Sequence, residues 1–373
     1  MRGNNVLGLI FANADEHNLP ELTGVRSVAS IPFGGSYRLI DFPLSGMVNA
    51  GISKVGIITN NNYQSLMDHI GSGKPWDLVR RHDEGLFLLP PFNADAIENY
   101  NSGRIGALKN ISNFLARSSQ EYVLLSDCTT VANIDFGEMF RCHEKSGNDI
   151  TLLAKHGITP TFQTQPVFNE IVDGRITKMS IGKYSDNEVD YGLKAMILKK
   201  SLLERLVTES FAKGYASFEK DFLMKNVNTL KMGVYMPEGF CEVIDSLENY
   251  FKANFKLLDM ANYKDLFNPA RPVYTKVYTE MPAVYGLESD VKNSLVADGC
   301  IIEGTVENSI LFRDCTVGKD AVVKNTIVMP HGMISEGAAL NCCITDKSVF
   351  VRSGRVISGA ESFPVYIGKN IQV

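Results

Sequence analysis

The first 260 residues alternate short apolar runs with segments whose apolar residues recur at helical spacing. This pattern predicts strands at residues 6–11, 55–59, 122–125, 150–154 and 195–198. It predicts helices at residues 64–70, 108–117, 137–146, 202–208 and 244–259. Nearly continuous apolar strands between helices are typical of an α/β domain with a mostly parallel sheet covered on both faces. Such sheets bind ligands at the carboxyl ends of their strands.

After residue 280 the pattern of apolar positions changes. Aliphatic residues recur every six positions in one row (Val322, Val328, Ile334 and Leu340) and in a second row (Val317, Val323 and Met329). A helix with 3.6 residues per turn has no use for a six-residue period, whereas a parallel β-helix of hexapeptide repeats requires it. The chain is therefore expected to form two domains, residues 1–275 and residues 276–373.

Composition narrows the class of protein. The chain has 373 residues, 45% of them hydrophobic and 21% charged, which suffices for two globular domains. The net charge is −5, so nucleic acid and anionic membrane are not expected partners. No segment has transmembrane length, and we expect a cytoplasmic protein. The seven cysteines contain no Cys-x-x-Cys pair and are expected to be reduced, mostly buried thiols.

Residues 31–45, IPFGGSYRLIDFPLS, combine a tight bend at Gly34 and Gly35 with a proline, Pro43, suited to the first turn of a helix. This stretch closely resembles the PFGGKYRIIDFPLSN signature of ADP-glucose pyrophosphorylases (glucose-1-phosphate adenylyltransferases). Residues 293–302, NSLVADGCII, resemble the NSLVSxGCxI segment with which the same family enters its C-terminal domain. The resemblance implies a Rossmann-like nucleotidyltransferase domain followed by a left-handed parallel β-helix.

In that family, a loop resembling LAGGxGTRLxxLT holds the phosphates of ATP through its backbone amides and its arginine. The corresponding residues 11–23 are FANADEHNLPELT. Asp15 and Glu16 would place carboxylates near the phosphates of ATP. Two like charges 4 Å apart repel by roughly 4 kcal/mol at an effective dielectric of 20. A lysine of the family's next motif is also replaced by Val28, whose isopropyl group carries no charge. The degenerate positions of the nucleotide loop and its neighbouring motif are Asn13, Ala14, Asp15, Glu16, Asn18 and Val28.

The resemblance also implies two aspartates that hold Mg²⁺ for adenylyl transfer. The first is kept as Asp127, and the second position falls on Val243, although Asp245 lies two residues away and is an alternative ligand. One carboxylate does not make a dedicated Mg²⁺ site. The glucose 1-phosphate lysine of the family corresponds loosely to Lys183, which is equally well explained as a solvated surface lysine. The nucleobase segment GTADA corresponds to residues 103–107, with Gly106 in place of aspartate.

Effector anions in this family bind basic residues between the two domains. The lysine after the glycine pair of the signature is Ser36 in this chain, while Arg38 remains as a possible sugar-phosphate or effector contact. Arg313 and Arg352 are expected to lie in solvated loops of the β-helix.

An intact frame with altered site residues indicates a pseudoenzyme that resembles the GlgD-type, non-catalytic subunit of bacterial ADP-glucose pyrophosphorylase. The resemblance implies no cofactor of its own, Mg²⁺ used by a catalytic partner subunit, and a mixed tetramer in glycogen biosynthesis. The expected subunit contacts lie in residues 31–52 and 290–345. Three alternatives stay open: an active adenylyltransferase with atypical site residues, a hexapeptide acyltransferase using His331, and a stand-alone sugar-phosphate sensor.

Overall fold

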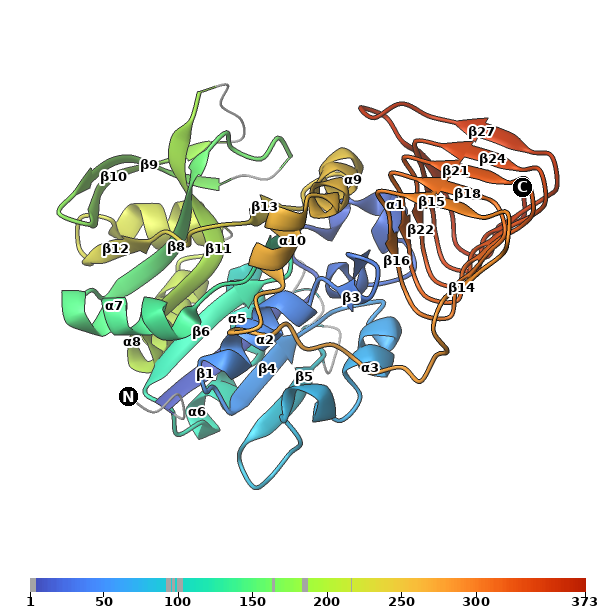
Figure 1. Cartoon of the computed structure of the whole chain (residues 1–373). Coiled ribbons are helices and arrows are strands. Elements are labelled where there is room, and N and C mark those ends of the chain that lie inside the picture. The colour runs from blue at the N-terminus through green and yellow to red at the C-terminus, as the bar shows by residue number, and fades with distance from the viewer. Residues whose placement is uncertain are drawn as a thin grey trace.

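The computed structural model describes residues 5–91, 95, 98, 103–162, 165–182, 187–215 and 217–373. An N-terminal α/β domain and a C-terminal β-helix lie side by side (Figure 1). No helix within the described part of the chain is both long enough and apolar enough to cross a membrane.

The described residues of the α/β domain form a nine-stranded sheet. The pairing directions show that β10 and β11 run opposite to the other strands, so the expected mostly parallel sheet is confirmed. The strand order is β5 (Gly85–Leu89), β4 (Lys54–Ile58), β1 (Val6–Phe11), β6 (Tyr122–Asp127), β11 (Val189–Lys199), β8 (Ile150–Gly157), β12 (Met232–Tyr235), β10 (Arg175–Gly182) and β9 (Gln165–Val172).

Helices cover both faces of this sheet. One buried apolar cluster joins the sheet to α2 (Asp41–Asn49), α3 (Gln64–Ile70), α7 (Phe136–Ser146) and α9 (Leu247–Phe255). A second cluster joins the opposite face to α5 (Arg104–Asn110), α6 (Ser112–Arg117) and α8 (Lys200–Ala212). The predicted single helix over 108–117 is wrong, because the chain breaks at Ile111 into α5 and α6. The helix predicted over 244–259 is shorter, and a 3₁₀ turn, η6 (Lys256–Leu258), follows it.

The C-terminal domain is a left-handed β-helix of three parallel five-stranded sheets. The first sheet contains β14 (Val284–Tyr285), β17 (Ile301–Ile302), β20 (Thr316–Val317), β23 (Met333–Ile334) and β26 (Phe350–Val351). The second contains β15 (Asp290–Lys292), β18 (Thr305–Glu307), β21 (Val322–Lys324), β24 (Ala339–Asn341) and β27 (Val356–Ser358). The third contains β16 (Leu295–Val296), β19 (Ile310–Leu311), β22 (Ile327–Val328), β25 (Cys343–Thr345) and β28 (Val365–Ile367).

The six-residue period locates the β-helix core with two errors of register. Most members of both predicted rows point inward and are fully buried, as Val317 and Val328 illustrate. Val322 instead lies on the outer side of β21, where its neighbour Val323 takes the core position. Met329 belongs to the core that the β-helix shares with the α/β domain.

The two domains are joined by a common core and by a buried ion pair. Helix α10 (Met260–Leu266) is the last helix before β14, and the chain between them passes without strand or helix. Arg26 donates from Nη2 to both oxygens of Asp346, at 2.7 and 2.9 Å, and the two side chains are 2% and 0% exposed. The tight bend of the signature is confirmed, since Gly34 and Gly35 have positive φ between β2 (Pro32–Phe33) and β3 (Tyr37–Arg38).

Candidate functional site

A cavity of about 310 Å³ opens at the carboxyl end of β1, where the sequence places the nucleotide loop. Residues 13–17 of that loop line one side. The start of α5, the middle of β11 and the start of η5 (Phe218–Met224) line the rest. The cavity is therefore in the position expected for a nucleotide site in an α/β sheet.

Asn13 ties the loop together with its own side chain. Its Nδ2 donates to Glu16 Oε2 at 2.7 Å and to the Asn61 carbonyl at 3.2 Å. Its Oδ1 accepts from Thr59 Oγ1 at 2.9 Å and from the Asn60 amide at 3.1 Å. The side chain is buried and fully hydrogen-bonded. A glycine here would leave backbone amides open to a ligand, whereas Asn13 fills the same space with internal bonds.

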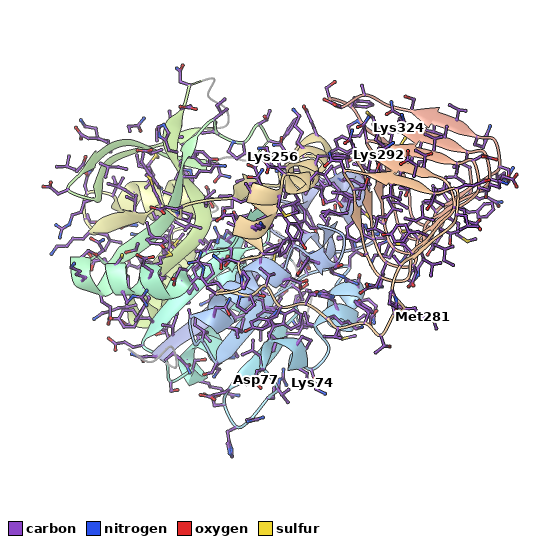
Figure 2. The ribbon with its side chains drawn as sticks, in the orientation of Figure 1. Lys74, Asp77, Lys256, Met281, Lys292 and Lys324 are labelled. Carbon is purple, nitrogen blue, oxygen red and sulfur yellow. The ribbon has the colours of Figure 1, made fainter. Side chains whose placement is uncertain are left out.

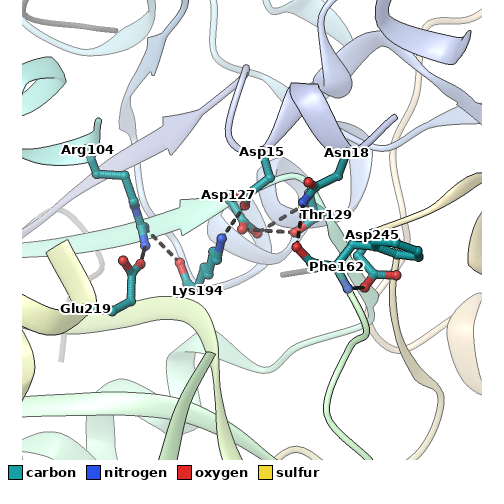
Figure 3. Close-up of polar contacts among 9 residues, drawn as sticks. All are labelled: Asp15, Asn18, Arg104, Asp127, Thr129, Phe162, Lys194, Glu219 and Asp245. Atoms are coloured by element: carbon teal, nitrogen blue, oxygen red, sulfur yellow. Dashed lines mark hydrogen bonds and ion pairs between the residues drawn. The ribbon is translucent and has the colours of Figure 1, made fainter. Parts of the chain in front are cut away.

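The carboxylate of Asp15 is held by the ammonium of Lys194, which projects from β11 (Figure 3). Asp15 has φ 56°, a left-handed conformation that aspartate tolerates better than most residues. Lys194 is only 8% exposed, so its charge is compensated almost entirely by protein groups. Lys194, the one lysine that lines the described pocket, is therefore paired with Asp15 of the same chain.

Arg104, the second cation lining the cavity, is also occupied by the chain. Its guanidinium lies 4.5 Å from the ring centre of Phe11 and 4.9 Å from that of Phe218. It donates to the Lys194 carbonyl at 3.0 Å and pairs with Glu219 at 3.5 Å (Figure 3). Stacking between two aromatic rings holds a guanidinium firmly.

Asp127, the remaining aspartate of the metal motif, ends β6 and is 2% exposed. Thr129 donates to both of its oxygens, from its amide at 3.3 Å and from its hydroxyl at 3.0 Å. Burial raises the pKa of Asp127, an effect that nearby Lys194 and Arg104 oppose. Its partner position, Val243, lies on β13 (Cys241–Val243), which pairs with β7 (Thr130–Ala132) and puts an isopropyl group opposite Thr130.

Both carboxylate oxygens of the alternative ligand, Asp245, accept hydrogen bonds from the chain itself. Its Oδ2 accepts from the Phe162 amide at 2.8 Å, and its Oδ1 accepts from Asn249 Nδ2 at 2.5 Å. Asn18, which stands in place of the family's arginine, donates to the Phe162 carbonyl at 3.3 Å. Asn18 and Asp245 therefore fasten the same loop from two sides (Figure 3). These contacts do not fit a two-carboxylate Mg²⁺ site at Asp127, Val243 and Asp245.

Three further predicted positions have different outcomes. Val28 is 1% exposed and belongs to the core, so the position of the lost lysine is now an apolar packing site. Lys183 lies outside the described residues. His331 occupies a turn with φ 63° and an exposed ring whose Nδ1 is 3.4 Å from Asp314, which gives no sign of the buried catalytic histidine of an acyltransferase.

A second site lies between the domains. Its walls are the signature hairpin and the α3 residue His69 on one side, and the β-helix turns at Arg313 and Lys347 on the other. Arg38 is 9% exposed and donates from Nη1 to the Ser65 carbonyl at 2.6 Å and to the Ser65 hydroxyl at 3.0 Å. The cavity is narrow, about 10 Å³, which is room for one water-sized group.

Arg313 corrects the expectation of a solvated loop residue. Its guanidinium lies 3.4 Å from the ring centre of Tyr278 and faces this site, whereas Arg352 is exposed as expected. Burial, together with the positive charges of Arg38 and Arg26, lowers the pKa of Lys347 to about 7. The positive charges of these side chains therefore repel one another and disfavour the charged form of Lys347.

His69 completes this inter-domain site. Its Nε2 is 2.6 Å from Asp41 Oδ1, and burial lowers the pKa of the ring. The neutral ring therefore donates from Nε2, and its buried Nδ1 has no hydrogen-bond partner among the described residues.

Sequence reasoning missed Lys194, Phe218 and Glu219. A lysine in the apolar run of residues 189–199 was the available signal, because a charged residue in a buried strand has to be paired. Glu219 and Phe218 carry no such signal, since they reach the cavity from a helical turn far along the chain.

Comparison with known proteins agrees with this architecture. Residues 8–162 match the nucleotidyl transferase family, and residues 282–362 match the GlmU-like, C-terminal hexapeptide family. A glycogen biosynthesis protein GlgD from Bacillus subtilis (strain 168) is 36% identical over 374 residues, covering 100% of this chain and 98% of the relative. Its counterpart from Geobacillus stearothermophilus is 38% identical over 323 residues, covering 86% and 83%.

A glucose-1-phosphate adenylyltransferase from Clostridium perfringens (strain 13 / Type A) is 29% identical over 381 residues, covering 99% of this chain and 94% of the relative. The order of the two domains, the signature hairpin and these full-length matches all agree. This chain belongs to the GlgD family, a relative of the glucose-1-phosphate adenylyltransferases.

Proposed function

We propose that this chain is a non-catalytic, regulatory subunit of ADP-glucose pyrophosphorylase that acts in glycogen biosynthesis in the cytoplasm. It associates with catalytic subunits in a mixed tetramer and raises or modulates their activity. The observation that carries the proposal is the ion pair of Asp15 and Lys194, which neutralises the nucleotide cavity from within.

The contacts around the cavity support the loss of ATP binding. A triphosphate needs open amides and free cations. Here Asn13 closes the loop, Lys194 binds Asp15, and Arg104 is stacked between Phe11 and Phe218. A nucleotide would have to break these contacts and also meet the carboxylate of Glu16.

The metal position supports the loss of chemistry. Adenylyl transfer depends on positioning and on neutralising charge at the phosphate. Asp127 is buried with a raised pKa, the side chain of Val243 has no oxygen, and Asp245 accepts a hydrogen bond from the Phe162 amide. We therefore assign Mg²⁺ and catalysis to the partner subunit.

The inter-domain site supports a regulatory role. Arg38, Arg313 and Lys347 suit the phosphate of a sugar-phosphate effector. The Nδ1 of His69, which has no partner among the described residues, suits a sugar hydroxyl. Since the cavity is narrow, binding requires Arg313 to leave the Tyr278 ring. That movement would change the contact between the domains, and coupling between sites typically amounts to about 1–3 kcal/mol.

The proposal is tested by co-expressing this chain with the catalytic glucose-1-phosphate adenylyltransferase of the same organism. We expect a complex larger than either protein by light scattering, with a higher rate or an altered effector response. Asp127→Asn in this chain should leave the activity of the complex unchanged. Two chains that do not associate, or a complex inactivated by Asp127→Asn, would contradict the proposal.

A further inference from the structure

Two of the seven cysteines are neighbours inside the β-helix. Ile301 of β17 pairs in register with Thr316 of β20. Cys300 and Cys315 directly precede these two residues and therefore occupy the same position in adjacent coils. The Ile301 amide donates to the Cys315 carbonyl at 2.9 Å. Both cysteine side chains belong to the β-helix core and are 0% exposed.

The spacing of this pair permits a disulfide. Parallel strands place in-register Cα atoms about 4.8 Å apart, within the range of roughly 4.4–6.8 Å that disulfides span. The two thiols also share a hydrogen bond, so their side chains face each other. The same position is small in the coils on either side, where Ala283 precedes Cys300 and Gly332 follows Cys315. A Cβ at Gly332 would lie 3.9 Å from Cys315 Sγ, so its absence leaves space in which the sulfur atoms can move.

Cys342 and Cys343 show that closeness in sequence is not sufficient for such a pair. Their side chains belong to different cores, Cys342 to the core shared with the α/β domain and Cys343 to the β-helix core. In register, Cys343 lies beside Thr326 and Val365 and not beside another thiol. The facing thiols at residues 300 and 315 are therefore a property of two particular coils.

The charges around the pair favour a disulfide over a bound metal ion. The hydrogen bond with Cys315 lowers the pKa of Cys300, an effect that burial and the carboxylates of Asp314 and Asp298 oppose. Burial raises the pKa of Cys315, so Cys300 is the thiol that ionises first. Two thiolates on a metal ion would add negative charge beside these carboxylates, whereas a disulfide is neutral.

The first coil gives a small oxidant a route to Cys300. Its strand, β14, is at the end of its sheet, and Figure 2 shows Met281, where the chain enters this coil, at the edge of the β-helix. The Val284 amide donates to the Cys300 carbonyl at 2.8 Å, and the Gly286 amide donates to the Ile302 carbonyl at 2.7 Å. Val284 is 58% exposed, so opening of this end coil uncovers little apolar surface. Such an opening exposes Cys300 before Cys315.

We propose that Cys300 and Cys315 are a redox-sensitive pair that hydrogen peroxide oxidises to an internal disulfide. The Cys300 thiolate attacks one oxygen of the peroxide and the O–O bond breaks. Cys300 becomes a sulfenic acid, and the departing hydroxide takes up the thiol proton as water. The Cys315 sulfur then attacks the sulfenic sulfur, and the hydroxide that leaves combines with the Cys315 proton as a second water. In total, two thiols lose two electrons and two protons, and one peroxide is reduced to two waters.

The turn at Phe312 and Arg313 links this pair to the inter-domain site. Both residues lie between the two cysteines in the chain, and both line that site. The Sγ of Cys300 donates to the Phe312 carbonyl at 3.1 Å, so oxidation removes a hydrogen bond from the turn. Formation of the disulfide is independent of the proposed regulatory function, whereas an effect of the disulfide on effector binding rests on that function.

Peptide mapping by mass spectrometry of the purified full-length chain tests the pair. The reduced protein is exposed to hydrogen peroxide, then unfolded and alkylated with N-ethylmaleimide. We expect a disulfide between the peptides that contain Cys300 and Cys315, with the loss of two hydrogens and reversal by dithiothreitol. Cys142, the exposed thiol, reports that the peroxide has acted. Alkylation of both Cys300 and Cys315 in protein whose Cys142 is already oxidised would overturn the proposal.

Matched alanine variants separate the pair from the effect of burial alone. Cys315→Ala should abolish the loss of two hydrogens and leave Cys300 as a sulfenic acid that dimedone traps. Cys343→Ala removes another buried thiol of the same core and should leave the yield of the disulfide unchanged. Equal loss of the disulfide in both variants, or a disulfide that forms only in urea, would overturn the proposal.

Discussion

The two cationic sites of this protein treat their charges in opposite ways. In the cavity at the end of β1, Lys194 and Arg104 are bonded to Asp15 and Glu219. Between the domains, Arg38, Arg313 and Lys347 approach one another closely enough for burial and mutual repulsion to lower the pKa of Lys347 to about 7. A site whose cations are already paired has little to offer an anion, whereas a site with crowded cations gains when an anion arrives.

The location of a pocket and the pairing of its charged groups are therefore separate kinds of evidence for a ligand. Both sites lie where a ligand is expected in this fold, at the end of a parallel strand and between two domains. Position alone would assign ligands to both. The partners of each charged group indicate that the inter-domain site is the better candidate for a phosphate.

The largest effect is expected on the free energy of unfolding, when the ion pair beside the inter-domain site is removed. Asp346→Ala leaves Arg26 buried without its carboxylate and should lower the free energy of unfolding by about 3–5 kcal/mol. Urea unfolding measures the loss. Glu307→Ala, which removes an exposed ion pair with Lys324, should cost less than about 1 kcal/mol. Equal effects of the two substitutions would show that the Arg26 pair is not buried in solution.

The nucleotide cavity is probed by releasing its lysine. Asp15→Asn keeps the side-chain shape, removes one carboxylate and frees Lys194, so affinity for ATP should rise by about tenfold, or 1.4 kcal/mol. Isothermal titration calorimetry without metal measures the change. Adding Lys194→Ala to Asp15→Asn should abolish the gain. If the unmodified chain already binds ATP at low micromolar concentration, internal pairing does not close this cavity.

The inter-domain site is probed by removing the cation that must move. Arg313→Ala should weaken binding of a hexose phosphate by about fivefold to tenfold, as expected for the loss of one charge-assisted hydrogen bond. Arg352→Ala removes an exposed arginine outside the site and serves as the control. Equal affinity of both variants would place the anion elsewhere.

The pH dependence of binding sharpens the comparison further. A bound phosphate raises the pKa of Lys347 from about 7, so binding takes up a proton, and affinity should fall severalfold between pH 7 and pH 8.5. Lys347→Met should remove this slope. In the free protein, the same lowered pKa means that the unfolded chain binds more protons between pH 7 and 10.5, so the contribution of Lys347 to stability increases as pH rises through that range. A pH-independent affinity would contradict the role of Lys347.

The frame of the protein was largely predictable from sequence because periodicity reports burial directly. The β1 strand at residues 6–11 and the helix at 64–70 are confirmed at their boundaries, and the β-helix is confirmed as an architecture. Errors arose where periodicity does not determine the outcome. The amphipathic segment at 108–117 has helical spacing on both sides of Ile111, yet the chain turns there.

In the nucleotide cavity, the sequence predicted only the departures from the family motif. The changed positions from Asn13 to Asn18 were evident as departures from a motif. What replaced the lost contacts was not evident, because Lys194 and Glu219 come from segments about 180 and 200 residues away. The prediction that Arg313 is a solvated loop residue was wrong for a similar reason, since its neighbour Tyr278 lies in the irregular segment that joins the domains.

The most direct test of the central claim is adenylyl transfer by the purified chain alone. ATP, Mg²⁺ and glucose 1-phosphate would be supplied at saturating concentrations, with a catalytic glucose-1-phosphate adenylyltransferase assayed in parallel. We expect no ADP-glucose above the enzyme-free background. Sustained formation of ADP-glucose that Asp127→Asn abolishes would show that the cavity at the end of β1 is still an active site.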